Sequence, residues 1–227
     1  MLTGLKDYPG AADQYIQILN RYPEDEELVR EAASYAAAHG RAQQLIAFYE
    51  KTSKDSPRDF RWPLLEARIQ TQLENFPAAL SGYARAIAIR PDRVEFYTAG
   101  GGLQERLLRF DEAAATYAKL YELNYHNSQW MERVATLRAR QGQADAAVKA
   151  LEAALITGPA FKPENSFAVA ARLESWNMIP QAREYAERGF SWAGANLLTD
   201  YQSGAQLYAR VTTRSRQHAT AFTACLR

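Results

Sequence analysis

The sequence predicts an all-α chain built from stacked helix-turn-helix repeats. Its landmark residues recur every 34 positions, which is the length of one helical hairpin with its turns. Tyrosine occupies one such position four times in succession, at Tyr15, Tyr49, Tyr83 and Tyr117. Small residues occupy two further positions, as Ala33, Ala67, Gly101 and Ala135 and as Ala11, Leu45 (the one exception), Ala79, Ala113 and Ala147. Because a single hairpin cannot bury its apolar face alone, this fixed period indicates an array in which each hairpin packs on the next.

Proline follows the same period and marks the joins between hairpins. It stands at Pro23, Pro57 and Pro91, is replaced once by Tyr125, and returns at Pro159. Since proline lacks a backbone N–H and restricts the residue before it, it favours the start of a new helix over the interior of one. The prolines therefore predict where one hairpin ends and the next begins.

The most complete copy of the repeat, residues 61–91, resembles the tetratricopeptide repeat family. Ala67, Ala79, Tyr83, Ala86 and Pro91 are similar to that family's small, small, aromatic, small and proline positions. The resemblance covers nearly the whole chain and implies a right-handed superhelical α-solenoid. It also implies that the first helix of each hairpin lines a concave groove while the second helix faces outward.

The N-terminal part is predicted to begin with the end of a helix, before Pro9. Pro9 suits the first turn of the next helix, where its missing N–H would be unpaired anyway, and that helix should reach about residue 20. The acidic run 24–27 favours the start of a helix that ends at Gly40, a C-cap residue. A second helix of this hairpin is expected over residues 42–54.

The middle of the chain contains one exception to good helix-forming sequence. Helices are expected over residues 59–73 and 76–90, with Pro63 and Pro77 in their first turns. The next hairpin, from about Asp92, carries three glycines in mid-helix, residues 100–102, and each costs roughly 1 kcal/mol of helix propensity relative to alanine. Close backbone packing at Gly101, the small position already marked by Ala33 and Ala67, is the favoured explanation, while a ligand approaching Gly102 or a helix bend stays open.

The C-terminal part shows a one-residue slip of the repeat. Helices are expected over residues 127–141 and 144–157, and the join 157–165 is one residue longer than the period allows. After it, Ala170, Pro180 and Ala182 take the positions held earlier by Ala67, Pro77 and Ala79. Helices over residues 163–176 and 179–190 follow, and a last helix over 215–226 is either a cap or a divergent repeat.

We predict one continuous domain over residues 1–227. Its parts are a half repeat, five repeats, and a divergent repeat or pair of capping helices, over residues 1–25, 26–59, 60–93, 94–127, 128–162, 163–196 and 197–227. Opening in mid-repeat, together with 21 arginines against 6 lysines, favours an origin in a larger bacterial protein. Without an apolar run of membrane-spanning length or a visible export signal, no membrane span is expected and a cytoplasmic location is predicted.

No residue pattern points to catalysis, a cofactor or a metal. His39, His126 and His218 are far apart in the array, and the single cysteine, Cys225, has no activating neighbour in sequence. The formal net charge of +1 gives no electrostatic drive toward nucleic acid or anionic lipid. The evenly spaced tyrosines are expected to pack in the core and not to stack on bases. We therefore expect neither an enzyme nor a nucleic-acid binder, and no cofactor.

The resemblance implies a partner-binding surface on the first helices of the hairpins. The candidate partner-binding residues are Arg30, Arg61, Leu64, Arg68, Thr98, Glu105, Arg106, Glu132 and Arg140. Arginine is the informative residue type, because a guanidinium group holds a carboxylate through two parallel hydrogen bonds, which suits an acidic peptide or a C-terminal carboxylate. The alternative is that these arginines pair with glutamates of neighbouring helices, namely Glu27, Glu95, Glu105 and Glu132.

The predicted function is a non-catalytic scaffold that binds a peptide or protein partner in its groove. A regulatory or oligomerisation domain of an enzyme or of a secretion or envelope assembly is the alternative, with self-association through the array ends. A helical-repeat RNA binder is a third hypothesis, and the near-neutral charge disfavours it. A chaperone-cofactor role is also disfavoured, because the groove lacks the asparagines of that clamp.

Overall fold

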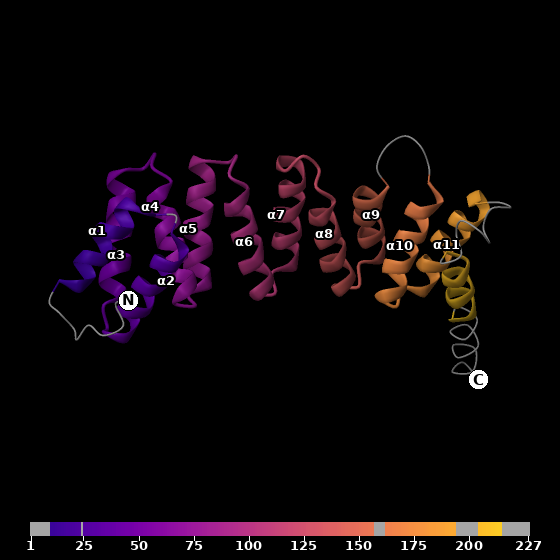
Figure 1. Ribbon diagram of the computed structural model, residues 1–227, viewed down its shortest axis with the longest axis horizontal. Coiled ribbons are helices and arrows are strands. Elements are labelled where there is room, and N and C mark those ends of the chain that lie inside the picture. Colours follow the sequence, from indigo (N-terminus) through magenta and orange to yellow (C-terminus); the bar gives the residue numbers. More distant parts are fainter. Residues whose placement is uncertain (1–9, 24, 157–161, 194–203, 215–227) are drawn as a thin grey trace. The chain divides into compact units, whose positions relative to one another are not determined.

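A computed structural model of the chain describes residues 10–23, 25–156, 162–193 and 204–214. Within these ranges the regular structure is helical and no strand occurs. The helices, labelled in Figure 1, are α1 (Ala11–Arg21), α2 (Glu26–Ala38), α3 (Ala42–Asp55), α4 (Arg61–Gln72), α5 (Phe76–Ile89), α6 (Val94–Arg106), α7 (Phe110–Leu123), α8 (Ser128–Arg140), α9 (Ala144–Leu155), α10 (Pro163–Ser175) and α11 (Ile179–Ala193), followed by a helical segment at 204–214. The predicted all-α fold is therefore confirmed.

The chain divides into two compact units, Met1–Thr116 and Tyr117–Arg227, and the division lies inside α7. In the first unit α4 packs against both α5 and α2, and in the second α8 packs against α9 and α10 against α11. Consecutive helices joined by short turns thus form hairpins in each unit. The single array over residues 1–227 and its repeat boundaries remain predictions.

Several expectations fall outside the described residues. They are the helix end before Pro9, the join at residues 157–161, and the last helix over 215–226 with His218 and Cys225. The structure therefore leaves these expectations as they stand.

The landmark residues of the repeat are the ones that the helices bury. All four evenly spaced tyrosines have side chains less than a tenth exposed, which confirms that they pack in the core. The alanines of the two small positions are buried, and completely so at Ala67, Ala79, Ala113, Ala135 and Ala147. Ala170 and Ala182, the alanines predicted after the slip, are fully buried as well. The 34-residue spacing in the sequence thus marks the residues through which the helices pack on one another.

The turn inside each hairpin repeats one backbone motif. One residue of each turn has a left-handed backbone, with φ between 58° and 72°, at Gly40, Glu74, Leu108, Gly142 and Asn177. The N–H after it bonds the carbonyl five residues back, as in Arg41 to Ala36 at 2.7 Å and Met178 to Leu173 at 3.0 Å. This is the Schellman motif that ends a helix and satisfies its last carbonyls. The left-handed residues lie 34 apart until Gly142 and then 35 apart, which confirms the one-residue slip.

An aromatic pair connects one hairpin to the next at one place in each unit. Tyr49 of α3 stacks on Trp62 of α4 at 6.3 Å between ring centroids, and Tyr117 of α7 stacks on Trp130 of α8 at 5.8 Å. In both pairs the tyrosine of the second helix of a hairpin meets a tryptophan in the first turn of the helix that follows. These contacts indicate that Trp62 and Trp130 pack between repeats and do not form an exposed binding surface.

Glycines play two opposite roles in the helices of the first unit. A Cβ on Gly82 of α5 would lie 2.8 Å from the Cβ of Ala67 and 2.9 Å from the carbonyl oxygen of Pro63, so α5 approaches α4 too closely for any side chain there. A Cβ on Gly100 or Gly102 of α6 would meet no atom within 4 Å. No close packing therefore explains Gly100 or Gly102, the packing expected at the small position Gly101 stays a prediction, and the close helix approach that requires glycine lies at Gly82.

We expect Gly82→Ala to lower the free energy of unfolding by about 1–3 kcal/mol, because the added methyl group overlaps the backbone of α4. Gly102→Ala is the matched control, and we expect it to raise the free energy of unfolding by ~0.5–1 kcal/mol through helix propensity alone. Urea unfolding followed by far-ultraviolet circular dichroism measures both. Equal destabilisation by the two substitutions would contradict the close approach at Gly82.

Leu108 and Gly142 occupy the same left-handed turn position in successive hairpins, so exchanging their residue types tests the turn. Leu108→Gly should raise the free energy of unfolding by up to ~1 kcal/mol, because a Cβ is unfavourable at positive φ. Gly142→Leu should lower it by a similar amount for the same reason. Thermal unfolding midpoints of the two variants should move in opposite directions, and a shift in the same direction would argue against a shared turn geometry.

Candidate functional site

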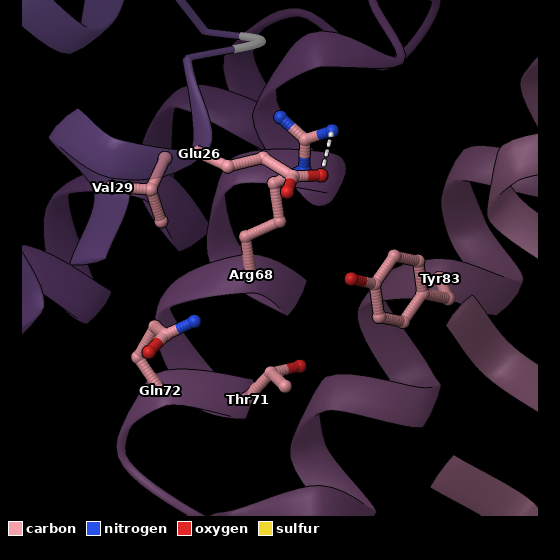
Figure 2. A pocket seen from close by; sticks show the side chains of 6 residues that line it. All are labelled: Glu26, Val29, Arg68, Thr71, Gln72 and Tyr83. Atoms are coloured by element: carbon pink, nitrogen blue, oxygen red, sulfur yellow. Dashed lines mark ion pairs between the residues drawn. The ribbon is translucent and has the colours of Figure 1, made fainter. Parts of the chain in front are cut away.

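A small polar cleft opens between α2, α4 and α5 in the first unit. Its volume is about 130 Å³, and the residues that line it are Glu26, Val29, Arg68, Thr71, Gln72 and Tyr83. Figure 2 shows the guanidinium of Arg68 beside the carboxylate of Glu26, and the hydroxyl of Tyr83 pointing toward Arg68 from the facing helix. We call this feature the Arg68 cleft.

Helix periodicity explains why these side chains meet. Arg68, Thr71 and Gln72 are three and four residues apart on α4, so they share one face of that helix. Glu26 and Val29 lie in the first turn of α2, which packs beside α4. The cleft is thus lined by α2 and α4, the first helices of two consecutive hairpins, and by Tyr83 of α5.

Arg68 is held in the cleft by two oxygen atoms of the preceding hairpin. Its Nη1 donates to the carbonyl oxygen of Pro23 at 3.0 Å, and its Nη2 lies 3.7 Å from Oε1 of Glu26. The Arg68 side chain is 16% exposed whereas that of Glu26 is 85% exposed. A solvated carboxylate at this distance is weakly bound, because exposed ion pairs contribute ~0–1 kcal/mol. The carbonyl bond therefore orients the guanidinium, and the carboxylate partner is exchangeable.

Tyr83 contributes a hydroxyl group to the cleft although its ring is buried. Burial raises the pKa of the Tyr83 phenol, while the hydroxyl of Thr71 and the positive charge of Arg68 act in the opposite direction. The phenol therefore stays protonated at neutral pH and remains a hydrogen-bond donor. Thr71 itself donates its hydroxyl to the carbonyl of Ala67 at 2.7 Å, which fixes its orientation.

The sequence predicted part of this site and missed the rest. Arg68 was predicted, and it lies at the centre of the cleft. Tyr83 was predicted only as a core residue, and its hydroxyl at the cleft wall carried no signal in the repeat pattern. Glu26 was visible only as a favourable charge at a helix start, because its contact with Arg68 joins two different hairpins.

The other candidates of the first unit lie outside this cleft. Leu64 is 2% exposed and packs in the core with Ala67 and Tyr83, so it is not available to a partner and its prediction as a binding residue is wrong. The physical reason is that α4 is covered on that face by α5, and the spacing of α4 positions alone does not reveal the covered face.

The other candidate arginines of the first unit already have contacts. Arg30 pairs with Glu27 one turn earlier at 3.3 Å, and Arg61 is bound by Asp59, with Nη2 2.6 Å from Oδ2. Arg106 lies over the ring of Phe76, with 4.2 Å from Cζ to the centroid. Thr98 donates its hydroxyl to the carbonyl of Val94 at 3.0 Å, and Glu105 is partly buried near the end of α6.

The second unit contains charged contacts between the first helices of neighbouring hairpins. Arg172 of α10 donates to Glu132 of α8 at 2.8 Å. Arg210 donates to Glu174 of α10 at 3.0 Å, and Arg214 lies 3.5 Å from the same carboxylate. Arg140 is exposed at the end of α8. Pairing of arginine with carboxylate across hairpins therefore does occur, and it includes Glu132, one of the glutamates weighed from the sequence, although its partner Arg172 is not one of the candidate arginines.

The described residues contain no candidate metal centre and no candidate membrane-spanning helix. No group of three or more His, Cys, Asp or Glu side chains that could hold a metal ion occurs in those ranges. Within the same ranges no helix combines the length and apolar character needed to cross a bilayer.

Comparisons with known proteins place the fold. No protein-family model matches the sequence, and no curated protein matches it either. Among solved structures, the Naa15/Naa10 complex bound to HypK-THB matches 94% of this chain and 33% of its own, at 16% identity and a TM-score of 0.57. YrrB, described as a TPR protein with an unusual peptide-binding site, matches 86% and 98% of the two chains at 14% identity and a TM-score of 0.45.

A third match is TTC0263, a thermophilic TPR protein of Thermus thermophilus, at 19% identity over 83% of this chain and 99% of that one, with a TM-score of 0.38. The chain's own helical hairpins, with their evenly spaced turns, meet the expectation from the sequence. Its fold is that of tetratricopeptide-repeat proteins. The resemblance of this TPR fold at such low identities concerns the architecture and says nothing about a partner.

The Glu174 carboxylate gives the TPR fold a pH-dependent contact. The hydrogen bond from Arg210 lowers the pKa of Glu174 below its usual 4.5, against a smaller opposing effect of burial. A lowered pKa in the folded state contributes stability that is complete above the unfolded value and is lost as the pH falls through the folded value. Since the arginines are 56% and 41% exposed, the contribution is only about 0.5–1 kcal/mol.

We expect Glu174→Gln to lower the free energy of unfolding by about 0.5–1 kcal/mol between pH 5 and 8. The difference in free energy of unfolding between this variant and the wild type should shrink as the pH falls below about 4.5. Urea unfolding at a series of pH values measures it. Glu187→Gln, which removes an exposed pair with Arg183 on one helix, is the control and should change stability less. A difference that grows at acid pH would contradict the assigned pKa direction.

Proposed function

We propose that this chain is a non-catalytic protein-interaction scaffold and that the Arg68 cleft receives a carboxylate group of a peptide or protein partner. The observation that supports it is the pre-oriented guanidinium of Arg68, held by the Pro23 carbonyl and facing a weakly bound, solvated Glu26. A partner carboxylate would take the place of Glu26 and bind Nη2. The buried phenol of Tyr83 would donate a second hydrogen bond to the same group.

The energetics favour a modest but selective interaction. Hydrogen bonds to charged groups contribute roughly 1.5–3 kcal/mol each when they are shielded from water, and Arg68 is largely shielded. The guanidinium is already ordered, so binding costs little side-chain entropy. A cleft of about 130 Å³ accommodates one carboxylate and not a whole peptide, so flanking residues of the partner would lie along the first helices of the hairpins.

The proposed surface keeps most of the residues predicted from the resemblance. Arg68 is central, with Thr71 and Tyr83 beside it, and Leu64 is removed. The flanking candidates that stay as proposals are Arg30, Arg61, Thr98, Glu105 and Arg106 in the first unit and Glu132 and Arg140 in the second. An acidic partner, a bacterial parent protein and a cytoplasmic location belong to the same proposal and rest on the sequence alone.

The contacts of the arginine side chains favour a protein-interaction scaffold over an RNA-binding protein. Arg30, Arg61 and Arg172 each contact a carboxylate, and Arg106 lies on an aromatic ring. A surface whose guanidinium groups are largely neutralised offers little attraction for a phosphate backbone. The oligomerisation hypothesis has no specific contact in its favour within the described residues.

We expect Arg68→Gln to weaken binding of an acidic peptide at least 10-fold, because it removes the charged Nη2 donor that would hold the carboxylate of the peptide. A peptide array that includes free and amidated C-termini selects the peptide, and fluorescence anisotropy gives its Kd. Tyr83→Phe should weaken binding by about 3- to 10-fold while keeping the ring in the core.

Arg41→Gln is the matched control, because Arg41 is an exposed arginine at the start of the outer helix α3. It should leave the Kd within a factor of about two, and circular dichroism should show equal helix content in all variants. If no peptide of the array binds at millimolar concentration, the scaffold proposal fails. If peptides bind and Arg68→Gln has no effect, the cleft is not their site.

A further inference from the structure

A second, larger cleft lies at the joins between hairpins of the first unit, where the segment before α4 meets the end of α5. Its volume is about 650 Å³, and its lining residues are Ser56, Pro57, Arg58, Asp59, Phe60, Arg61 and Arg90. We call it the Phe60 cleft. It shares no lining residue with the Arg68 cleft, and the repeat pattern gave no reason to expect it.

Two of its arginines are held in fixed orientations by carboxylates two residues away. Nε and Nη2 of Arg61 donate to Oδ1 and Oδ2 of Asp59 at 2.9 Å and 2.6 Å. Nε and Nη2 of Arg90 donate to Oδ1 and Oδ2 of Asp92 at 2.8 Å and 2.7 Å. Both pairs use the same edge of the guanidinium, so the Nη1 group takes no part in either. Two ordered guanidinium groups therefore keep donors for a further acceptor.

These ion pairs persist at any pH near neutrality. The hydrogen bonds from Arg61 lower the pKa of Asp59. Those from Arg90 lower the pKa of Asp92 to about 2. Both carboxylates therefore stay ionised and keep their arginines in place, and an incoming anion does not have to order these side chains.

An aromatic ring forms the apolar part of the Phe60 cleft. The guanidinium carbons of Arg90 and Arg93 lie 5.7 Å and 5.6 Å from the centroid of the Phe60 ring. The same ring packs on Phe96, with 5.7 Å between centroids, which anchors it to α6. Cations stacked on an aromatic face lose part of their hydration, so their remaining donors interact more strongly with an anion.

The excess charge of the cleft is positive and comes from one residue. Asp59 neutralises Arg61, Asp92 neutralises Arg90 and Glu95 neutralises Arg93, whereas Arg58 is exposed on the rim. A cleft with one uncompensated positive charge, two ordered guanidinium groups and an apolar ring matches a single anionic group next to an apolar side chain.

We propose that the Phe60 cleft binds a carboxylate or phosphoryl group of a peptide segment, with a neighbouring apolar side chain of that peptide on the Phe60 ring. The anion lies among Arg58, Arg61 and Arg90. This is a second peptide-contacting site, separate from the Arg68 cleft, and it stands whether or not the Arg68 cleft binds a partner.

Three fluorescent hexapeptides that differ at one position test the site. Each carries leucine beside phosphoserine, glutamate or serine, and fluorescence anisotropy at 50 mM salt measures the Kd of each for the whole chain. At least one of the two anionic peptides should bind at least 10-fold more tightly than the serine peptide, and 200 mM salt should weaken that binding because part of the attraction is screened. A tighter phosphoserine peptide identifies a phosphoryl group, and equal affinities identify any carboxylate-like anion.

Arg58→Glu is the decisive variant, because it reverses the uncompensated charge on an exposed rim and leaves both ion pairs intact. It should weaken anionic-peptide binding about 10-fold or more, whereas Arg41→Glu, the same charge change at an exposed arginine of α3, should change it less than about 2-fold. Binding should survive Arg68→Gln, which separates this site from the Arg68 cleft. Equal affinity for the serine and anionic peptides, or equal effects of the two charge reversals, would overturn the proposal.

Discussion

The close approach of the two helices in each hairpin is the constraint on which the rest of the fold depends. Ala67 and Ala79, with their counterparts in the other hairpins, are buried, and at Gly82 there is no room even for a methyl group. Helices that touch along small residues leave the larger side chains to fill the space on either side. The buried tyrosines of the second helices do this, and Tyr49 and Tyr117 each stack on a tryptophan of the next hairpin. The sequence therefore repeats because successive hairpins pack their helices through the same positions.

Polar contacts orient the arginine side chains on the packed helices but contribute little to the free energy of unfolding. Arg68 reaches back to Pro23 and Glu26, Arg172 to Glu132, and Arg210 to Glu174, each across one hairpin. Such half-exposed pairs contribute little energy each, but they occupy the guanidinium groups of the first helices. What distinguishes the Arg68 cleft is that its carboxylate partner is loosely held while the guanidinium is firmly oriented. The Phe60 cleft achieves orientation differently, through carboxylates close in sequence to each arginine. Both clefts thus present ordered guanidinium donors that the carboxylates of the chain itself leave partly available to a ligand.

The repeat pattern predicted the helices, the buried tyrosines and the slip after Gly142, because each of these follows from spacing along one chain. It predicted Arg68 as a binding residue because periodicity places that residue on the face of α4 that the resemblance implies. It was wrong for Leu64, since the same periodicity does not tell which neighbouring face is covered by α5. It also gave no signal for the open space around Gly100 and Gly102, because the space around a helix depends on side chains from elsewhere in the chain.

The sequence by itself determined the fold class, the hairpin length and the identity of the core landmarks, since local helix signals and a fixed period leave few other ways to bury the apolar positions. Only the tertiary structure decided where the clefts lie. The Arg68 cleft combines residues of three helices, from Glu26 to Tyr83, and the Phe60 cleft brings Arg90 to the segment before α4. A cleft is shaped by side-chain volumes and by which charges are already paired. The shape of a cleft and the pairing of its charges depend on contacts between helices, so the sequence of one helix does not reveal them.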